Sequence, residues 1–362
     1  MPKVLVAPLD WGLGHATRCI PIIRELVALG CEVTIAASGL TEVLLRTEFP
    51  HLAILSLKGY EIRYGKSGVI FSLLRQLPRI LRTIKYEQKW LAELLKTEQF
   101  DAVISDNRPG LFHASIPCVY ITHQLQILSG LGGMVDRLLY KLHSHYYKGF
   151  DEVWVPDFET APGLAGKLSH PEQNSSKVKY IGPLTRLQKN NETAFRYDLL
   201  ILLSGPEPQR SIFEQEITKQ LHHRNDKVLI VRGMPGTKMK PNHLPQNIEI
   251  QNHLSAAELE SAIAASSLII CRSGYTTVMD LICLRKKAVL IPTPGQTEQE
   301  YLARRLEESG FFPHMIQSEF NLKEVIIRSR DFTYNHPESE ELFQQFKKTV
   351  RNWLGKIEEK EH

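Results

Sequence analysis

Short apolar runs recur along the chain, and each is followed by a turn rich in Gly, Pro or polar residues and then by apolar positions at helical spacing. Runs of this length that alternate with helical patterns are typical of buried strands in a parallel α/β sheet. The first run is Lys3–Ala7, and another is Leu268–Cys271. Further strands are predicted at 31–37, 52–57, 101–105, 117–122, 151–156, 177–181, 197–203, 227–231, 247–251 and 288–291, with an edge strand at 311–316. The chain is therefore expected to be an α/β protein with Rossmann-like domains.

The length of the chain and its polar segments predict two domains. A chain of 362 residues can bury two cores of ordinary size. The polar stretch 184–195 follows a predicted strand and is expected to be the linker between them. This places the N-terminal domain at 1–183 and the second domain at 196–337, and it leaves 338–362 as a final charged amphipathic helix.

Composition and charge exclude several classes of protein. The net charge of +4 is too small to indicate a nucleic-acid partner, and no apolar run approaches the roughly 18 residues of a membrane-spanning helix. The five cysteines are scattered, which is typical of buried free thiols in a reducing compartment, and no Cys/His cluster indicates a metal site. The N-terminus enters a strand directly, without a signal segment. We therefore expect a cytoplasmic protein that holds no metal ion.

A basic amphipathic helix is predicted within residues 68–97. Its cations alternate with leucines and isoleucines and are Arg75, Arg79, Arg82 and Lys85. Such a helix can lie on an anionic membrane. The same pattern also fits a helix that covers a core with one face and is solvated on the other, and both interpretations stay open.

The turn after Leu268–Cys271 carries groups that suit a diphosphate. Ser273, Gly274 and Thr277 lie at the start of a predicted helix, where free N–H groups and the positive dipole end attract anions. Arg272 adds a fixed charge, and the carboxylate of Asp280, farther along the helix, could accept hydrogen bonds from a ribose. An ordinary strand–helix turn with a Ser-Gly cap fits these residues equally well.

A second group of polar residues follows strands of the N-terminal domain. Gly14, His15 and Arg18 come after the first strand, and Asp106 and His123 come at the ends of two others. The C-terminal ends of parallel strands form the edge at which such sheets bind ligands. An imidazole titrates near neutrality, so His15 is a candidate base, and Arg18 could hold an acceptor anion or form a surface ion pair. Turn caps and satisfied core polar groups are the alternative interpretation.

The stretch Cys271–Ala303 resembles the C-terminal nucleotide-sugar motif of glycosyltransferase family 28. The residues that match the motif are Arg272, Ser273, Gly274, Thr277, Asp280, Pro292 and Gln299. Two positions depart from it, since the family usually has Glu where Asp280 stands and a second Gln where Glu300 stands. Gly12–Arg18 also resembles the GxGHxxR segment shared by family 28-like transferases and a related UDP-sugar hydrolase.

This resemblance implies a GT-B fold, in which two Rossmann-like domains face a central cleft that binds a UDP-sugar. It implies His15 as the base and makes Arg18, Asp106 and His123 candidates on the acceptor side. The residues expected on the donor side are Gly14, Ser204, Gly205, Arg272, Ser273, Gly274, Thr277, Asp280, Gln299 and Glu300. Near Ser204 and Gly205 the family often has a glycine-rich phosphate loop, and here two prolines remove N–H donors from it. In GT-B proteins a C-terminal helix often packs back on the first domain, which is the expectation for 338–362.

The resemblance implies an enzyme, a glycosyltransferase of the hexosyltransferase class. Such an enzyme would transfer a hexose or N-acetylhexosamine from a UDP-sugar, with inversion and without a metal ion or other cofactor. The expected acceptor is a cell-envelope glycan or a lipid-linked molecule, and the latter would bring the protein to the inner face of the plasma membrane. Two alternatives stay open, a UDP-sugar hydrolase in which His15 activates water and a nucleotide-sugar-binding protein without catalysis.

Overall fold

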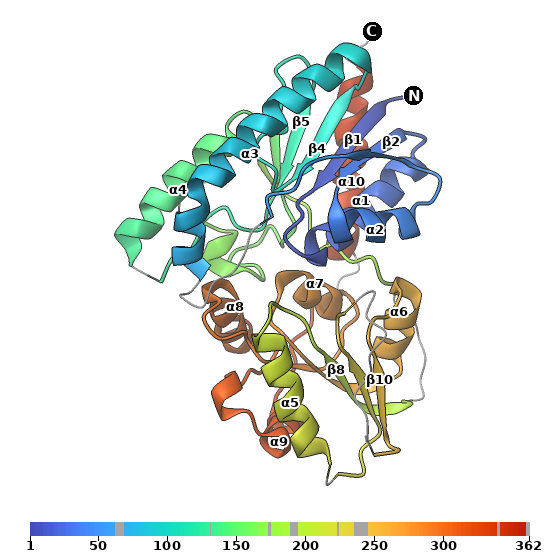
Figure 1. Cartoon of the computed structure of the whole chain (residues 1–362), viewed down its shortest axis with the longest axis vertical. Helices are drawn as coiled ribbons and strands as arrows, with labels where there is room; N and C mark the ends of the chain where they lie inside the picture. The colour runs from blue at the N-terminus through green and yellow to red at the C-terminus, as the bar shows by residue number, and fades with distance from the viewer. Residues whose placement is uncertain are drawn as a thin grey trace. The chain divides into compact units, whose positions relative to one another are not determined.

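A computed structural model of the whole chain describes residues 1–61, 69–130, 132–172, 175–188, 195–222, 224–234, 245–338 and 341–359. The chain divides into two compact units (Figure 1). One comprises residues 1–185 together with the C-terminal segment from 339 onward, and the other comprises residues 186–338. Each unit contains one parallel sheet.

The N-terminal unit contains a seven-stranded sheet in the order β3-β2-β1-β4-β5-β6-β7. Its strands are β1 (Lys3–Pro8), β2 (Glu32–Ala37), β3 (Ala53–Ser56), β4 (Ala102–Asp106), β5 (Cys118–Ile121), β6 (Glu152–Val155) and β7 (Val178–Tyr180). Its helices are α1 (Leu13–Ala28), α2 (Gly39–Glu48), α3 (Val69–Thr97), α4 (Gly133–Tyr147) and α10 (Glu341–Glu358), with the short turn η1 (Gly166–Leu168). Every residue of β4 and β5 is buried, as expected of parallel strands that are covered on both faces.

The second unit contains a five-stranded sheet in the order β10-β9-β8-β11-β12. Its strands are β8 (Tyr197–Leu202), β9 (Val228–Val231), β10 (Ile248–Gln251), β11 (Ser266–Cys271) and β12 (Ala288–Leu290). Its helices are α5 (Gln209–Leu221), α6 (Ala256–Ala264), α7 (Tyr275–Cys283), α8 (Thr297–Glu308) and α9 (Leu322–Asp331), with the short turn η2 (Gln317–Glu319). Ser255 caps α6 through the predicted capping box with Glu258.

The predicted α/β class with parallel sheets is confirmed. The predicted edge strand at 311–316 is wrong, because the structure has a single parallel bridge there, between Leu290 and His314. Two helices, α2 and α9, have no counterpart among the predicted elements.

Helix α10 packs on the N-terminal unit, although the whole second unit precedes it in sequence (Figure 1). Its apolar face, at helical spacing, is buried and consists of Phe346, Val350, Trp353, Leu354 and Ile357. The Trp353 ring lies edge-on to Trp154 of β6 at 5.5 Å between centroids, and Arg351 Nε donates to Glu25 Oε1 of α1 at 3.1 Å. Gly182 has φ +74°, and a Cβ there would collide with the Leu342 carbonyl oxygen, so the chain after β7 can pass this close to α10 only at a glycine.

Candidate active site

The strand register brings the predicted base, His15, and the three predicted acceptor-side residues to one edge of the N-terminal sheet. In the ladder of β1 and β4, Pro8 pairs with Asp106, and Asp106 pairs in turn with Ile121 of β5. His15 and Arg18 lie in the first two turns of α1, which follows β1, and His123 lies two residues after β5. Because all three strands run in parallel, these side chains converge at their C-terminal ends.

Asp106 is the centre of this group, and its side chain is fully buried. His15 Nδ1 lies 3.0 Å from Asp106 Oδ1. Arg18 Nε donates to Asp106 Oδ2 at 2.5 Å, and Arg18 Nη2 donates to Oδ1. Cys19 Sγ also lies 3.4 Å from Oδ2. The carboxylate is therefore held in one orientation, with one oxygen facing the imidazole of His15.

Two further contacts join Arg18 to the histidines. Arg18 Nη1 lies 3.0 Å from His123 Nδ1, and Arg18 Nη2 lies 2.8 Å from His15 Nδ1. Arg18 is only 2% exposed. Sequence reasoning expected this guanidinium to hold an acceptor anion or to pair on the surface, whereas the structure places it inside the protein, against Asp106 and both imidazoles.

The electrostatics keep His15 neutral and Asp106 ionised. Burial lowers the pKa of His15, the positive charge of Arg18 lowers it further, and the negative charge of Asp106 offsets part of this fall. Burial alone would raise the pKa of Asp106, but the positive charge of Arg18 and the hydrogen bonds from Arg18 and His15 outweigh burial and hold that pKa below its ordinary value. A neutral imidazole beside an oriented carboxylate is the arrangement of a general base.

The predicted donor residues lie at the corresponding edge of the second sheet. Leu202 of β8 pairs with Cys271 of β11, which pairs with Leu290 of β12, so the turns after these three strands are neighbours. The turn after β8 carries Ser204 and Gly205, both exposed. The turn after β11 carries Arg272, Ser273 and Gly274 and leads into α7.

Gly274 is the N-cap of α7, and as a glycine it has no side chain with which to cap the helix. A Cβ built on Gly274 would meet nothing within 4 Å, so the space beside the helix start is open. The positive end of the helix dipole and the lack of a side chain at this position suit an approaching anion. Thr277 and Asp280 lie in the first and second turns of α7 and are both half-buried.

Thr293, which sequence reasoning missed, faces the same turns. It is 1% exposed, and its Oγ1 has no hydrogen-bond partner within the part of the chain that the structure describes. Gly205 has φ +99°, and a Cβ there would lie 3.4 Å from this hydroxyl. The only signal in the sequence was that Thr293 directly follows a strand and Pro292.

Arg272 has a different environment from the one expected of it. Its guanidinium donates to the carbonyl oxygens of Ile291 at 3.1 Å, Pro292 at 3.3 Å and Gln209 at 3.1 Å. It also lies over the Phe213 ring, 4.4 Å from the centroid, and it is 1% exposed. Burial lowers its pKa to about 10, so it stays charged at neutral pH. These contacts differ from the expected direct contact with a diphosphate, and they tie the turn after β11 to the end of β12 and the start of α5.

Three other predicted donor residues also fasten loops together. Ser273 Oγ donates to the Gln299 carbonyl at 2.8 Å, and the Thr293 N–H donates to Gln299 Oε1 at 2.9 Å. The Gly295 N–H donates to Glu300 Oε1 at 2.9 Å. These bonds fix the turn after β12, which contains Thr293, to the first residues of α8.

A charged network that was not predicted joins the loops on the other side of β8. Arg210 Nη1 donates to Glu214 Oε2 at 2.6 Å, and Arg232 Nε donates to Glu214 Oε1 at 2.6 Å. Arg232 Nη1 in turn donates to Asn252 Oδ1 at 2.9 Å. Arg232 and Asn252 directly follow β9 and β10, so the sequence predicted their position after strands. It did not predict the contact of Arg232 with Glu214 on α5.

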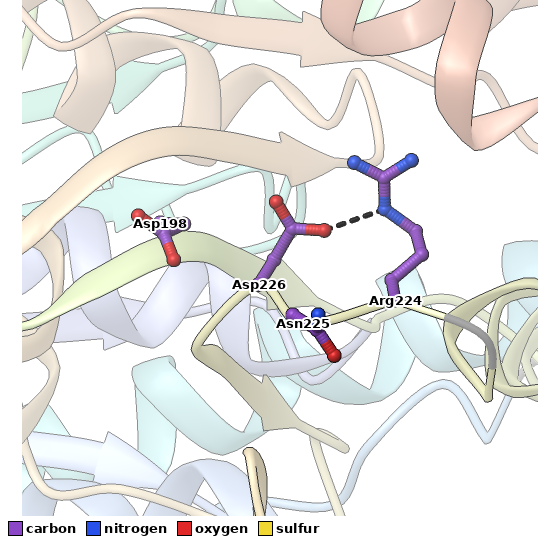
Figure 2. A pocket seen from close by; sticks show the side chains of 4 residues that line it. All are labelled: Asp198, Arg224, Asn225 and Asp226. Carbon is purple, nitrogen blue, oxygen red and sulfur yellow. Dashed lines mark hydrogen bonds and ion pairs between the residues drawn. The ribbon is translucent and has the colours of Figure 1, made fainter.

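A hollow of about 410 Å³ in the second unit lies elsewhere and is lined by Asp198, Arg224, Asn225 and Asp226 (Figure 2). These residues lie near the N-terminal ends of β8 and β9, whereas the predicted donor residues follow the C-terminal ends of strands. Arg224 donates to Asp226 at 2.5 Å, which leaves Asp198 to make the lining acidic. This hollow does not suit a diphosphate.

Two classes of feature are missing from the described residues. They contain no group of three or more His, Cys, Asp or Glu side chains that could hold a metal ion. Nor does any helix among them combine the length and apolar character needed to cross a membrane.

Comparison with known proteins shows a similarity that extends beyond the motif at Cys271–Ala303. Residues 209–351 match the glycosyltransferase family 28 C-terminal domain. The chain is a glycosyltransferase. Its sequence is 24% identical over 344 residues to an uncharacterized glycosyltransferase of Methanosarcina acetivorans, covering 90% of this chain and 86% of that protein.

Two further similarities cover nearly the whole glycosyltransferase. It is 23% identical over 377 residues to the UDP-N-acetylglucosamine--N-acetylmuramyl-(pentapeptide) pyrophosphoryl-undecaprenol N-acetylglucosamine transferase of Clostridium tetani, covering 93% of this chain and 92% of that protein. The solved structure of the kitacinnamycin glycotransferase superposes with a TM-score of 0.66 at 13% identity, covering 99% of this chain and 96% of that one. The predicted GT-B fold is thereby confirmed.

Proposed function

We propose that this glycosyltransferase transfers a hexose or N-acetylhexosamine from a UDP-sugar to an acceptor hydroxyl, with inversion and without a metal ion or other cofactor. The observation that carries the proposal is the contact of His15 Nδ1 with the buried carboxylate of Asp106, 3.0 Å away, at the ligand edge of the N-terminal sheet. It supports a base that is neutral at pH 7 and acts through its other ring nitrogen.

In the proposed reaction, His15 Nε2 takes the proton of the acceptor hydroxyl. The acceptor oxygen forms a bond to the anomeric carbon while the bond from that carbon to the diphosphate oxygen breaks, and UDP leaves. Attack opposite the leaving group inverts the anomeric centre. The proton on His15 then passes to solvent, which restores the neutral base.

The donor would bind in the second unit, beside the three neighbouring turns after β8, β11 and β12. The start of α7 offers a positive dipole end beside Gly274, and Thr293 offers a buried hydroxyl without a partner among the described residues. Charge that develops on the leaving diphosphate would be stabilised there by groups that are already oriented. The family 28 domain match and the UDP-sugar named for the Clostridium tetani relative support UDP as the nucleotide.

The first test is thermal unfolding with UDP, TDP, GDP and a panel of UDP-sugars. A ligand at 100 times its Kd stabilises the protein by about 2.7 kcal/mol, which is easily measured. Selective stabilisation by UDP and one UDP-sugar is expected, and stabilisation by no nucleotide would overturn the proposal.

The second test is an activity assay with the selected UDP-sugar, in which His15→Gln is the inactive control. Release of free sugar that no candidate acceptor suppresses would identify hydrolysis instead of transfer, and unchanged turnover in the presence of EDTA checks metal independence.

We further propose that the acceptor is lipid-linked and that the enzyme meets it at an anionic membrane surface. On α4, three apolar side chains one turn apart are exposed, Met134 by 85%, Leu138 by 58% and Leu142 by 53%, and Arg137 and Lys141 are exposed beside them. A helix face of leucines between cations is typical of contact with anionic lipid. The Clostridium tetani relative carries a lipid-linked acceptor in its name, which supports the same partner.

The basic helix that the sequence predicted has a similar exposed face. On α3, Leu77 and Leu81 are exposed, as are Arg82 and Lys85, whereas Arg79 forms an ion pair with Glu61.

Co-sedimentation with vesicles tests the proposed membrane contact. Binding to anionic vesicles and not to zwitterionic ones is expected, with a loss in Leu138→Gln/Leu142→Gln and none in Ile212→Gln, which removes a similarly exposed side chain from α5. Equal binding by all three proteins would contradict it.

A further inference from the structure

Arg18 contacts both histidines of the acceptor-side group, and an arginine can only donate hydrogen bonds. A guanidinium has five N–H groups and no acceptor, and it keeps its charge in proteins. Any nitrogen that receives a hydrogen bond from Arg18 must therefore carry a lone pair. This makes the contacts of Arg18 informative about where the imidazole protons are, which the heavy-atom positions alone do not show.

For His123 the contact determines the tautomer. Its Nδ1 lies 3.0 Å from Arg18 Nη1, so Nδ1 accepts this hydrogen bond. A neutral imidazole has one N–H, and in His123 that proton must then be on Nε2. His123 is 7% exposed.

For His15 two neighbours compete for the same nitrogen. Nδ1 lies 3.0 Å from Asp106 Oδ1, which requires a proton on Nδ1, and 2.8 Å from Arg18 Nη2, which requires a lone pair. If His15 Nδ1 were unprotonated, its lone pair would face the buried carboxylate oxygen of Asp106. Two hydrogen-bond acceptors at that distance repel each other. Arg18 Nη2, in contrast, already donates to the same carboxylate, which is a better acceptor than an imidazole. The contact with Asp106 therefore prevails, and the proton of His15 is on Nδ1.

We propose that Arg18 is a positioning residue and that it and Asp106 give the two histidines opposite tautomers. Asp106 holds the proton of His15 on Nδ1, so that Nε2 of His15 is unprotonated, and Arg18 makes Nδ1 of His123 an acceptor, so that the proton of His123 is on Nε2. The pair would then present one acceptor and one donor at the same sheet edge. His15 can take a proton from an acceptor hydroxyl, and His123 can donate a hydrogen bond. The use of these tautomers in transfer rests on the proposed function, whereas the tautomers themselves follow from the contacts of His15 with Asp106 and of His123 with Arg18.

Charged and titratable groups from three elements face His15 or its carboxylate partner. Arg18 and Cys19 come from α1, Asp106 from β4, and His123 from the turn after β5. Among these, Arg18 disfavours the imidazolium of His15 and Asp106 favours it. Removing the positive charge of Arg18 while the negative charge of Asp106 stays should raise the pKa of His15.

The test is the nitrogen NMR spectrum of the intact protein labelled with ¹⁵N-histidine at neutral pH. His15→Gln and His123→Gln assign the two rings, and the nitrogen shifts read which atom carries the proton. We expect Nδ1–H for His15 and Nε2–H for His123 in the unmodified protein. Protonation of His123 at Nδ1, or the same tautomer in both rings, would overturn the proposal without the need for any variant of Arg18.

Arg18→Gln then separates positioning from a purely structural role. We expect the pKa of His15 to rise and His123 to lose its single tautomer, while Arg24→Gln, which removes an exposed arginine of the same helix, changes neither. An unchanged His15 titration in folded Arg18→Gln would also contradict the proposal. The NMR readouts need no turnover. They can therefore contradict the tautomer proposal while the transfer activity is present, and they can support it while no transfer activity is found.

Discussion

At the scale of single residues, the decisive feature of this protein is which polar side chains are buried and what each one faces. His15, Arg18 and Asp106 are close enough that the pKa values of His15 and Asp106 each depend on the other two residues. Thr293 is the contrasting case, a buried hydroxyl without a hydrogen-bond partner among the described residues. An unpaired buried polar group is unfavourable by itself, so this hydroxyl, which faces Gly205 in the turn after β8, is a candidate for contact with a ligand.

The pH dependence of turnover follows from the lowered pKa of His15. The base must be neutral, and burial and Arg18 hold its pKa below the ordinary value of about 6.5. The fall of kcat/KM on the acidic side should therefore lie below pH 6.5. The profile is measured at a saturating concentration of the acceptor. In Asp106→Asn the loss of negative charge should move this fall to still lower pH. A fall that begins above pH 6.5 would contradict the assignment of His15 as the base.

Thr293→Val tests the buried hydroxyl with little change of shape. One hydrogen bond contributes about 0.5–1.5 kcal/mol, so the Kd for the UDP-sugar should rise roughly 2–12-fold. The free protein should unfold at the same or a higher temperature, because the lost hydroxyl has no partner to leave behind. Calorimetric titration and thermal unfolding measure the two effects. Loss of stability without loss of affinity would assign Thr293 to the fold instead of the donor site.

At the scale of elements, the turns at the C-terminal strand ends are held in place by side chains that bond to neighbouring turns. Arg272 joins the turn after β11 to the end of β12 and the start of α5, and Ser273 joins it to α8. In the N-terminal unit, Glu87 of α3 is fully buried and accepts hydrogen bonds from Arg108 and Tyr60. Such cross-links let loops present ligand-binding groups in fixed positions.

Arg272→Ala is expected to lower the stability of the protein, because the contacts of Arg272 are with groups of the protein itself. It leaves carbonyl oxygens without their donor in a buried place and removes the packing on Phe213, so a loss of about 3–5 kcal/mol is expected. Arg304→Ala, at an exposed position on α8, is the control and should stay within about 0.5 kcal/mol. Chemical unfolding of both variants measures this. Unchanged stability together with lost nucleotide binding would restore the direct role that the sequence suggested.

At the scale of the whole molecule, the chain builds one parallel sheet, then a second, and then returns to the first unit through α10. The return is stabilised by the apolar face of α10 and by bonds such as that of Gln345 Nε2 to the Tyr180 carbonyl, at 2.9 Å. The family 28 domain match extends to residue 351 and so includes most of this helix, although its core contacts lie in the N-terminal unit.

Trp353→Ala tests how strongly the N-terminal unit depends on this helix. Trp353 is 3% exposed, and truncating a buried Trp costs about 3–5 kcal/mol. Thermal unfolding should show a clear loss, and exchange of backbone amides should increase in β6, where Trp154 packs on the removed ring. Lys348→Ala on the exposed side of α10 serves as the control. Equal stability of the two variants would mean that α10 is not part of the core of this unit.

The sequence by itself determined the alternation of strands and helices, because buried parallel strands need continuous apolar runs and helices need a different period. It also placed His15, Asp106 and Gly274 at the C-terminal ends of strands, since that position depends only on the order of elements. Which strands are neighbours, and therefore which of these residues meet, depends on contacts between distant segments, and the failed prediction at 311–316 has the same cause.

Tertiary structure alone decided the roles of Arg18 and Arg272. Both looked like charges offered to a ligand, and both are buried against groups of the protein itself. A sequence shows that a side chain is positive, but the direction in which it points and the partners that it finds are set by residues far away in the chain. The unpartnered hydroxyl of Thr293 was invisible for the same reason, because whether a polar group is satisfied is a property of its surroundings in space.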